Sequence, residues 1–315
     1  MFLVDTHCDT LYARSVEKNK FTNASTPQVT PERLSRGGVT LQVCALFAGP
    51  EGPKGQGVNA PREMASAQLA ALPSLTSEEI KKVDSPFDAK EGECHILLSI
   101  EGGEIIEDSI ERLREFRALG VRLLALTWNN ENLIAYPHTE NGHRGLKPFG
   151  WEVVKEMNRL GIAADVSHLG EGGFWDLIFH NEKSPMASHS CCRKLCMHTR
   201  NLTDDQIRAL IECKGWIGIN FCPYFLTADG NATVDTVIDH IAHIADLGGI
   251  GNVGFGSDFD GIDSTPEGIA HPGEFPNLLS ALSKKGFSEN EISDIAGQNF
   301  LRYMRQFEAI LDPHL

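Results

Sequence analysis

The sequence has no long hydrophobic run. Hydrophobic residues make up 41% of its 315 residues, yet no apolar stretch approaches the roughly 20 residues that a membrane-spanning helix needs. It also has no positively charged start followed by an apolar run and a small-residue cleavage site, the pattern of a secretory signal. These absences argue against a membrane-spanning or secreted protein, and we expect a cytoplasmic one.

Basic residues are also few. The chain has 28 Lys and Arg against 43 Asp and Glu, which gives a formal net charge of -15 at pH 7. Such a charge disfavours nucleic acids and anionic membranes as partners. It does not exclude small substrates, because metal ions and local arginines can set the field inside a cleft.

Cysteine pairs with metal-binding spacing are missing. The 8 cysteines are scattered, and in a cytosolic chain they are expected to be reduced, buried thiols. Three of them lie with His198 in the segment 191–198. Their spacing is not that of a paired C-x-x-C site, and no second pair lies nearby, so we predict no separate metal site there.

Short apolar, β-branched segments recur along the chain, and most are followed by a helical pattern. The expected strands are 2–6, 39–47, 95–100, 121–127, 162–166, 186–188, 216–221 and 252–256. The expected helices are 61–83, 105–118, 149–160, 173–180 and 234–247. A further helix is expected to begin at Thr203, whose side chain can cap it, with Gln206 three residues later. The last 40 residues also have a helical pattern.

The number and spacing of these segments predict a (β/α)8 TIM barrel of the metal-dependent hydrolase type. We expect a single domain over 1–315, with the C-terminal helices packed outside. The continuous apolar strands fit a parallel sheet that is covered on both faces. A doubly wound sheet stays open as an alternative, although no G-x-G-x-x-G follows the first strand.

Polar side chains stand at the ends of the predicted strands. They are His7, Asp9, Glu101, His168, His189 and Asp258. Because the strand ends of such a barrel converge at one mouth, these side chains are expected to meet there. Three histidines and three carboxylates suit two divalent metal ions bridged by one carboxylate and a water. Glu101 is the natural bridge, since it lies between the ligand pair of the first strand and that of the fifth and sixth.

The remaining histidines are expected to be mostly structural. Those in this group are His95, His180, His240, His243 and His271. For His138 and His143, in the polar loop after the fourth strand, a role facing the substrate stays open.

Several motifs together resemble the membrane (renal-type) dipeptidase family of zinc peptidases over nearly the whole length. The matching segments are DTHCD at 5–9, SIEGG at 99–103, PFG at 148–150 with the helix that follows, DVSH at 165–168, SHS at 188–190, RNL at 200–202 and GFGSDFDG at 254–261. Because the secretion signal, lipid anchor and disulfides of the animal members are not evident, we expect a soluble, bacterial-type member.

The resemblance implies a metal centre and a reaction. Two Zn2+ ions per chain would be held, one by His7, Asp9 and Glu101, the other by Glu101, His168 and His189. A metal-bridging hydroxide would hydrolyse free dipeptides, including those with a C-terminal D-residue. Asp258 would handle the proton, Arg200 would receive the carboxylate of the dipeptide, and the protein would be a homodimer.

The chain departs from this family at Trp128. The family often has a histidine here, which is thought to polarise the scissile carbonyl. Tryptophan has one indole N–H, which donates but does not titrate. Trp128 is therefore expected to bind substrate either through this donor or as a wall of the pocket.

Two rival functions stay open. One is another amidohydrolase-type activity on the same fold, such as a cyclic amidase, lactonase or deaminase. Many such enzymes bridge their metals with a modified lysine on the fourth strand, which this chain lacks, and this favours the dipeptidase. The other rival is a metal-binding homologue without catalytic activity, which the departure at Trp128 keeps open.

Overall fold

Parallel strands form the centre of the structure. The computed structural model describes residues 1–15, 27–47, 49 and 61–310. Its strands are β1 (Val4–Asp5), β2 (Leu41–Phe47), β3 (Ile80–Lys82), β4 (Cys94–Glu101), β5 (Val121–Ala125), β6 (Ala163–Asp165), β7 (Met186–Ala187), β8 (Trp216–Ile219) and β9 (Val253–Phe255). They pair in the order β2-β1-β9-β8-β7-β6-β5-β4-β3, and β2 also pairs with β4. This second pairing closes all of them except β3 into a barrel.

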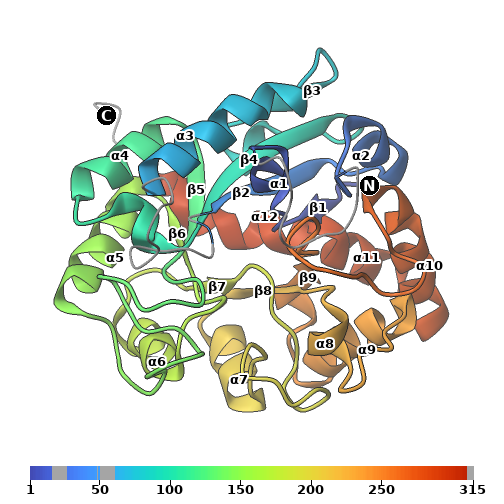
Figure 1. Ribbon diagram of the computed structural model, residues 1–315. Helices are drawn as coiled ribbons and strands as arrows, with labels where there is room; N and C mark the ends of the chain where they lie inside the picture. Colours follow the sequence, from blue (N-terminus) through green and yellow to red (C-terminus); the bar gives the residue numbers. More distant parts are fainter. Residues whose placement is uncertain (16–26, 48, 50–60, 311–315) are drawn as a thin grey trace.

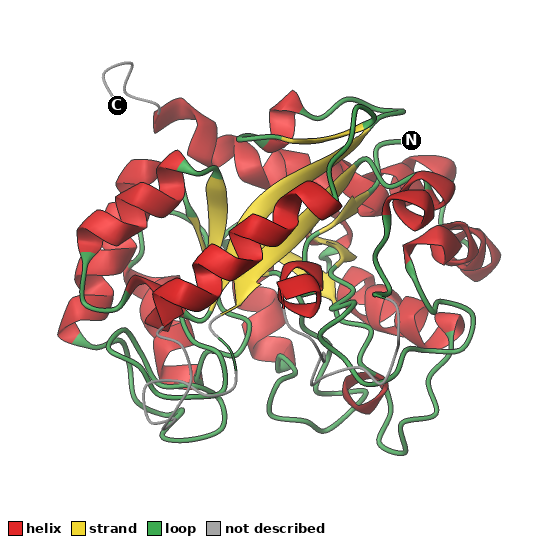
Figure 2. Ribbon diagram, turned by 45° about the horizontal axis from the view of Figure 1, so that its top comes forward, coloured by secondary structure: helices red, strands yellow, loops and turns green. Residues whose placement is uncertain are grey.

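Helices lie around the outside of the barrel (Figures 1 and 2). They are α1 (Thr10–Ser15), α2 (Pro31–Gly37), α3 (Pro61–Ala71), α4 (Ile110–Ala118), α5 (Pro148–Leu160), α6 (Glu171–His180), α7 (Asp204–Glu212), α8 (Pro223–Leu226), α9 (Val234–Asp246), α10 (Phe275–Lys285), α11 (Glu289–Ser293) and α12 (Asn299–Met304). The fold is therefore the predicted (β/α)8 barrel, and the doubly wound alternative is wrong.

Local capping explains where several helices begin. The Thr203 side chain accepts a hydrogen bond from the Gln206 amide, and the Gln206 side chain accepts one from the Thr203 amide. This reciprocal arrangement, which the sequence predicted for α7, satisfies amides that have no partner in the first helical turn. The same arrangement begins α9 at Thr233 and α11 at Ser288.

Two predicted helices are too long. The helix over 61–83 ends at Ala71, and a 3-10 turn with Pro73 follows it. Proline has no amide hydrogen to continue an α-helix, and the chain then forms β3, whose Ile80 is buried. The helix over 105–118 begins only at Ile110, because Glu107 adopts a left-handed backbone with φ of 52°.

Other boundaries differ less. The strand expected over 216–221 ends at Ile219, and the strand over 162–166 is Ala163–Asp165. The helices α5, α6 and α9 agree with expectation to within two residues, the usual uncertainty of helix ends. The glycine- and proline-rich sequence at 48–57 lies, apart from Gly49, outside the described residues.

The barrel is filled with apolar side chains at the end opposite the polar strand ends. Phe2, Trp216 and Phe300 belong to one buried cluster there, with the Trp216 and Phe300 rings edge to face at 5.4 Å. Phe300 brings α12 against the start of the barrel strands. Packing at this end leaves the carboxyl ends of the strands as the place for polar chemistry.

No helix in the described part of the chain combines the length and apolar character needed to cross a bilayer.

Candidate metal centre

The five predicted metal ligands come together at the carboxyl ends of the strands. Glu101 is at the middle of this group: its Oε1 lies 3.0 Å from His168 Nε2, 3.3 Å from His189 Nε2 and 3.7 Å from His7 Nε2. The potential ligand atoms of Glu101, His168 and His189 all lie within 4.8 Å of one another, and so do those of His7, Asp9 and Glu101. The structure thus groups the side chains as the two predicted ligand sets, with Glu101 shared.

A buried carboxylate at the end of β6 orients the ring of His189. Asp165 accepts hydrogen bonds from the Ser188 backbone amide (2.9 Å) and from the Ser188 hydroxyl. Since that hydroxyl donates to Asp165, its oxygen accepts from His189 Nδ1, 2.7 Å away. The proton of the neutral His189 ring is therefore on Nδ1, and Nε2 presents a lone pair to Glu101.

Asn129 orients His168 in the same manner. Its Oδ1 lies 2.8 Å from His168 Nδ1 and 3.1 Å from His138 Nε2, and as a carbonyl oxygen it accepts from both rings. The lone pair of His168 is therefore also on Nε2, which lies 3.2 Å from His189 Nε2. Burial, with a smaller contribution from Arg200, holds the pKa of His168 well below its usual range. His168 is thus set up as a neutral ligand.

This group of atoms fits a metal ion. Glu101 Oε1 and the Nε2 atoms of His168 and His189 present lone pairs to one another at 3.0–3.3 Å. Lone pairs that face one another repel, and a cation between them removes this repulsion. Imidazole nitrogen with carboxylate oxygen is a donor set for zinc and related divalent metals. The donors present therefore agree with the predicted metal.

His7 and Asp9 form a more acidic group on the β1 side. His7 Nε2 lies 3.4 Å from Asp9 Oδ2 and 3.8 Å from Asp258 Oδ1. Neither His7 Nε2 nor Asp9 Oδ1 has a hydrogen-bond partner, although both atoms are buried. Burial lowers the pKa of His7, but Glu101 and the two aspartates outweigh it and raise the pKa to about 10. The two unpartnered atoms again fit a bound cation.

Asp258 stands beside both ligand groups. Its Oδ2 accepts a hydrogen bond of 2.8 Å from Asn220 Nδ2, and its Oδ1 faces His7. Burial raises the pKa of Asp258 to about 7, although His7 opposes the rise. A Cβ at Gly261 would lie 2.5 Å from Asp258 Oδ1 and 2.1 Å from an Asp9 oxygen, so glycine keeps this space open.

The backbone at two of these residues is unusual. His168 and Asp258 have φ of 68° and 64°, in the left-handed region that few non-glycine residues adopt. Such conformations persist where surrounding contacts hold them, and they gather at functional sites.

A cavity of about 230 Å³ opens beside the metal centre, and we call it the acidic cavity. It is lined by Asp9, Phe47, Glu101, Trp128, Asn129, His168, Cys222, Phe225, Asp258, Gly261, Ile262 and Asp263. Trp128 forms part of its wall: the ring is edge-on to Phe47 at 5.1 Å and tilted against His168 at 6.1 Å. The predicted substrate residue Trp128 therefore lies next to the predicted ligands.

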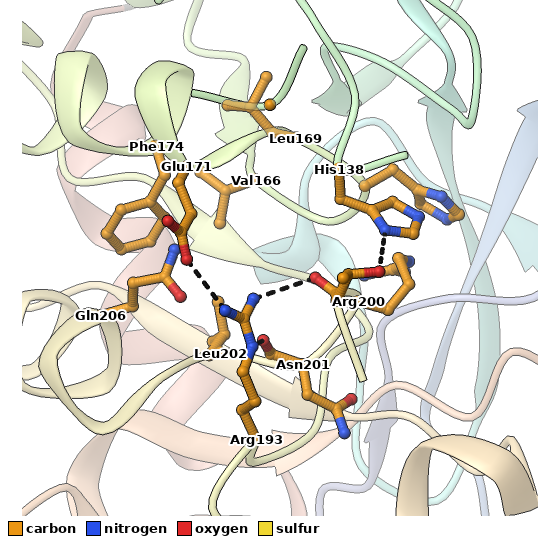
Figure 3. Close-up of a pocket in the computed structure, with 13 residues that line it drawn as sticks. His138, Val166, Leu169, Glu171, Phe174, Arg193, Arg200, Asn201, Leu202 and Gln206 are labelled. Atoms are coloured by element: carbon orange, nitrogen blue, oxygen red, sulfur yellow. Dashed lines mark hydrogen bonds and ion pairs between the residues drawn. The ribbon is translucent and has the colours of Figure 1, made fainter. Parts of the chain in front are cut away.

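A second cavity of about 270 Å³, the arginine cavity, shares His168 with the acidic cavity. Figure 3 shows its lining, with Arg193, Arg200 and Glu171 labelled. Arg193 and Arg200 line it, and Glu171 pairs with Arg193 at 2.9 Å. Arg200 is only 5% exposed. Its guanidinium donates to the His189 carbonyl (3.1 Å) and the Ser190 hydroxyl (3.2 Å), while its Nε has no partner.

Comparison with known proteins places the chain in a family. The sequence pattern of the membrane dipeptidase family, peptidase family M19, matches residues 1–314. The chain belongs to this family. An uncharacterized dipeptidase of Schizosaccharomyces pombe, C965.12, is 31% identical over 98% of this chain and 81% of its own length.

Two further relatives extend the comparison. Dipeptidase tcpJ of Claviceps purpurea is 34% identical over 70% of this chain, but the chain spans only about half of its length, 53%. A metallopeptidase from Rhodobacter sphaeroides, crystallised with a phosphinate mimic of the dipeptide L-Ala-D-Ala, is 25% identical. The two structures align with a TM-score of 0.85 over 98% of this chain and 99% of that one.

Some functional positions of this member of the dipeptidase family were not singled out from the sequence. Asn129 and Asn220 orient His168 and Asp258, and Ser188 connects Asp165 to His189. All three follow a strand within a few residues, so their position at the mouth of the barrel is the signal that could have found them.

Residues expected to be structural lie away from the centre. His240 contacts the backbone of Cys192 and Leu226, and His243 pairs with Asp204 at 2.8 Å. In the described residues, the groups that could hold a metal contain no cysteine. His138, in contrast, lines the arginine cavity and connects Asn129 with Thr199, so it belongs to the site.

Proposed function

We propose that the protein is a metal-dependent dipeptidase with two zinc ions per chain and Glu101 as the bridging ligand. The observation that supports this most strongly is the position of Glu101 Oε1, within 3.0–3.7 Å of the Nε2 atoms of His168, His189 and His7. His7 and Asp9 would complete one metal site, and His168 and His189 the other. When bound, the two ions supply an activated water and polarise the substrate carbonyl.

Asp258 is the proposed proton carrier. Because Asn220 Nδ2 donates to Asp258 Oδ2, a proton on this carboxyl group would be on Oδ1, the oxygen that faces His7. From there it can reach the leaving amine of a peptide bond at the metal centre. A pKa that burial raises to about 7 suits a group that gives and takes a proton near neutral pH.

Arg200 is the proposed reader of the free carboxylate. Its unpartnered Nε and its position in the arginine cavity leave a hydrogen-bond donor for an anion. An arginine can bind a carboxylate through two parallel N–H groups. A carboxylate held this close to the metal centre limits substrates to short peptides.

The stereochemistry of the substrate is also a proposal. The related Rhodobacter metallopeptidase binds a mimic of L-Ala-D-Ala, and we infer that this chain likewise accepts a C-terminal D-residue. The homodimer, the cytoplasmic location and the single domain over 1–315 stay predictions.

A panel of free dipeptides tests the proposed function. Metal-free protein reconstituted with Zn2+ should bind about two ions per chain and hydrolyse L-L and L-D dipeptides, whereas the metal-free protein should not. Cyclic amides, lactones and aminopurines serve as controls for the rival amidohydrolase activities. Hydrolysis of a control substrate alone, or two bound ions without hydrolysis of any substrate, would contradict the dipeptidase.

A further inference from the structure

The two cavities that meet at His168 differ in charge. The acidic cavity is lined by Asp9, Glu101, Asp258 and Asp263 and by neither Lys nor Arg. The arginine cavity is lined by two arginines, and its one carboxylate, Glu171, already pairs with Arg193. A free dipeptide has an ammonium group at one end and a carboxylate at the other, so this arrangement distinguishes its two ends.

Each cavity also contains a buried polar atom that has no hydrogen-bond partner, a donor in the arginine cavity and an acceptor in the acidic cavity. Arg200 Nε is such a donor in the arginine cavity, and Asp9 Oδ1 is such an acceptor in the acidic cavity. Arg200 is only 5% exposed and Asp9 only 3%. Burying such groups without a partner is costly. The proposed metal accounts for Asp9 Oδ1, whereas Arg200 Nε points to an anionic group of a ligand in the arginine cavity.

Metal binding would leave one carboxylate of the acidic cavity available. Asp9, Glu101 and Asp258 all belong to the groups that could hold a metal, whereas Asp263 belongs to none of them. The charge of two divalent ions exceeds that of three carboxylates. Asp263 is exposed and has no ion pair with another described residue, so its charge remains for a substrate.

Apolar side chains also line the acidic cavity, beside the polar His168 and Asn129. Phe47, Trp128, Phe225 and Ile262 contribute to its lining, and Phe47 and Ile262 are buried. A volume of about 230 Å³ accommodates one amino-acid side chain and not a long peptide. Apolar walls around a small number of polar groups are typical of a site that binds an apolar side chain and fixes its orientation.

We propose that the acidic cavity binds the N-terminal residue of a dipeptide, with its ammonium group at Asp263 and an apolar side chain against Phe47, Trp128 and Ile262. The C-terminal residue then lies toward Arg200, and the peptide bond lies beside His168, which lines both cavities. This inference rests on the proposed dipeptidase function. It adds a residue that selects for a free amino terminus and a class of preferred substrate.

The test compares Leu-Gly with its hydroxy analogue, in which a neutral hydroxyl replaces the ammonium group. Asp263→Asn should lower kcat/KM for Leu-Gly about tenfold, because a charge-assisted contact is lost. On the hydroxy analogue the same variant should stay within about twofold of the wild type, since that substrate has no charge for Asp263 to bind. Calorimetric binding of a phosphinate isostere of Leu-Gly, with and without its amino group, should show the same selective loss.

Asp108→Asn is the matched control. Asp108 is exposed and follows β4 at the same end of the barrel, but it does not line the acidic cavity. This variant changes the net charge by the same amount and should leave both substrates unaffected. Metal content should be equal in the two variants and the wild type, because Asp263 is not proposed as a ligand.

The outcomes separate this inference from the function on which it rests. If the wild type hydrolyses Leu-Gly and Asp263→Asn loses activity equally on both substrates, or loses none, Asp263 does not bind the ammonium group. A wild type that prefers Asp-Gly or Lys-Gly to Leu-Gly would overturn the apolar side-chain site. A metal-loaded wild type without activity on any dipeptide would overturn the dipeptidase and this inference together.

Discussion

The two halves of the candidate metal centre differ in how their ligands are held. In the β6–β7 half, the rings of His168 and His189 each have a hydrogen-bond partner behind them, Asn129 and Ser188. In the β1 half, His7 Nε2 and Asp9 Oδ1 have no partner. One half is therefore preorganised through neutral contacts, and the other through an excess of carboxylate charge.

The pKa directions follow the same division. Carboxylates around His7 raise its pKa to about 10 despite burial. Burial, and then His7 and Arg200, hold the pKa of His189 well below its usual range. Without metal, His7 in the β1 half therefore holds a proton near neutral pH, whereas His189 in the β6–β7 half does not. A metal ion must displace this proton, and we expect metal binding in the β1 half to be the more sensitive to pH.

Beneath both halves, the chain uses the same supporting arrangement. Asp5 accepts from the amide and hydroxyl of Ser257, as Asp165 does from Ser188. The difference is that the Ser188 oxygen also accepts from a ligand ring, His189 Nδ1. Asp5 also accepts from Gln42 Nε2 and contacts no ligand ring, whereas Asp165, through Ser188, also sets the tautomer of a ligand.

Removing the ligand that both halves share should have the largest effect. Glu101→Gln keeps the shape of the side chain but removes its charge, so we expect loss of metal from both halves and abolished hydrolysis. The barrel should remain folded, because the core around the strands is unchanged. Metal per chain, measured by elemental analysis beside circular dichroism, checks this, and full occupancy in the variant would contradict a bridging Glu101.

Changing the proton carrier should separate chemistry from metal binding. Asp258→Asn should keep most of the bound metal and lower kcat by roughly 10²–10⁴-fold, the usual range for an acid–base group. Kinetics and metal content measured on the same preparation give the answer. A carboxylate oxygen of Asp258 also lies within 4.8 Å of ligand atoms of His7 and His189, so a loss of metal with the activity would make Asp258 a ligand of the β1 half.

A pair of serine variants tests the difference between the halves directly. Ser188→Ala removes the acceptor of His189 Nδ1 and should weaken metal binding about 10–100-fold, as outer contacts to ligand histidines typically do. Ser257→Ala removes an equivalent hydroxyl from Asp5, which contacts no ligand ring, and should lower thermal stability while leaving metal affinity unchanged. Competition with a chelator measures both affinities, and equal losses would show that the two halves are supported alike.

Arg200 tests the contribution of the arginine cavity. Arg200→Met should raise KM and lower kcat/KM for free dipeptides about tenfold or more, because a charged hydrogen bond to the substrate carboxylate is lost. Dipeptide amides lack that carboxylate and should be little affected. Steady-state kinetics on matched pairs, such as Leu-Gly and Leu-Gly amide, check this. A similar loss on both would assign Arg200 to holding His189 through its carbonyl.

The strand ends of this centre could be predicted because the barrel places them together. His7, Glu101 and His168 lie far apart in the sequence, but a parallel barrel brings the ends of β1, β4 and β6 to one mouth. The order of the strands and the side on which their polar ends lie were therefore enough to group these ligands.

The supporting residues could not be predicted in the same way. Whether Asn129 faces His168 depends on the path of the loop after β5, and several loop paths suit the same sequence. The helix over 61–83 was mispredicted for a related reason. The pairing of Ile80 with Cys94 in the sheet is a tertiary contact that the local helical pattern does not reveal.

Trp128 should give the smallest effect on turnover. Its ring contacts Phe47 at the end of β2 and His168 in the β6–β7 half, and it is part of the wall of the acidic cavity. We therefore expect Trp128→Phe, which keeps most of the ring area, to leave kcat within about threefold and to shift the preference among N-terminal side chains. A loss of kcat by about 10–100-fold at constant KM would instead show that the indole N–H contacts the oxyanion. Trp128→His provides the second measurement: it should raise kcat only if a donor to the oxyanion is limiting, and a wall residue predicts no gain.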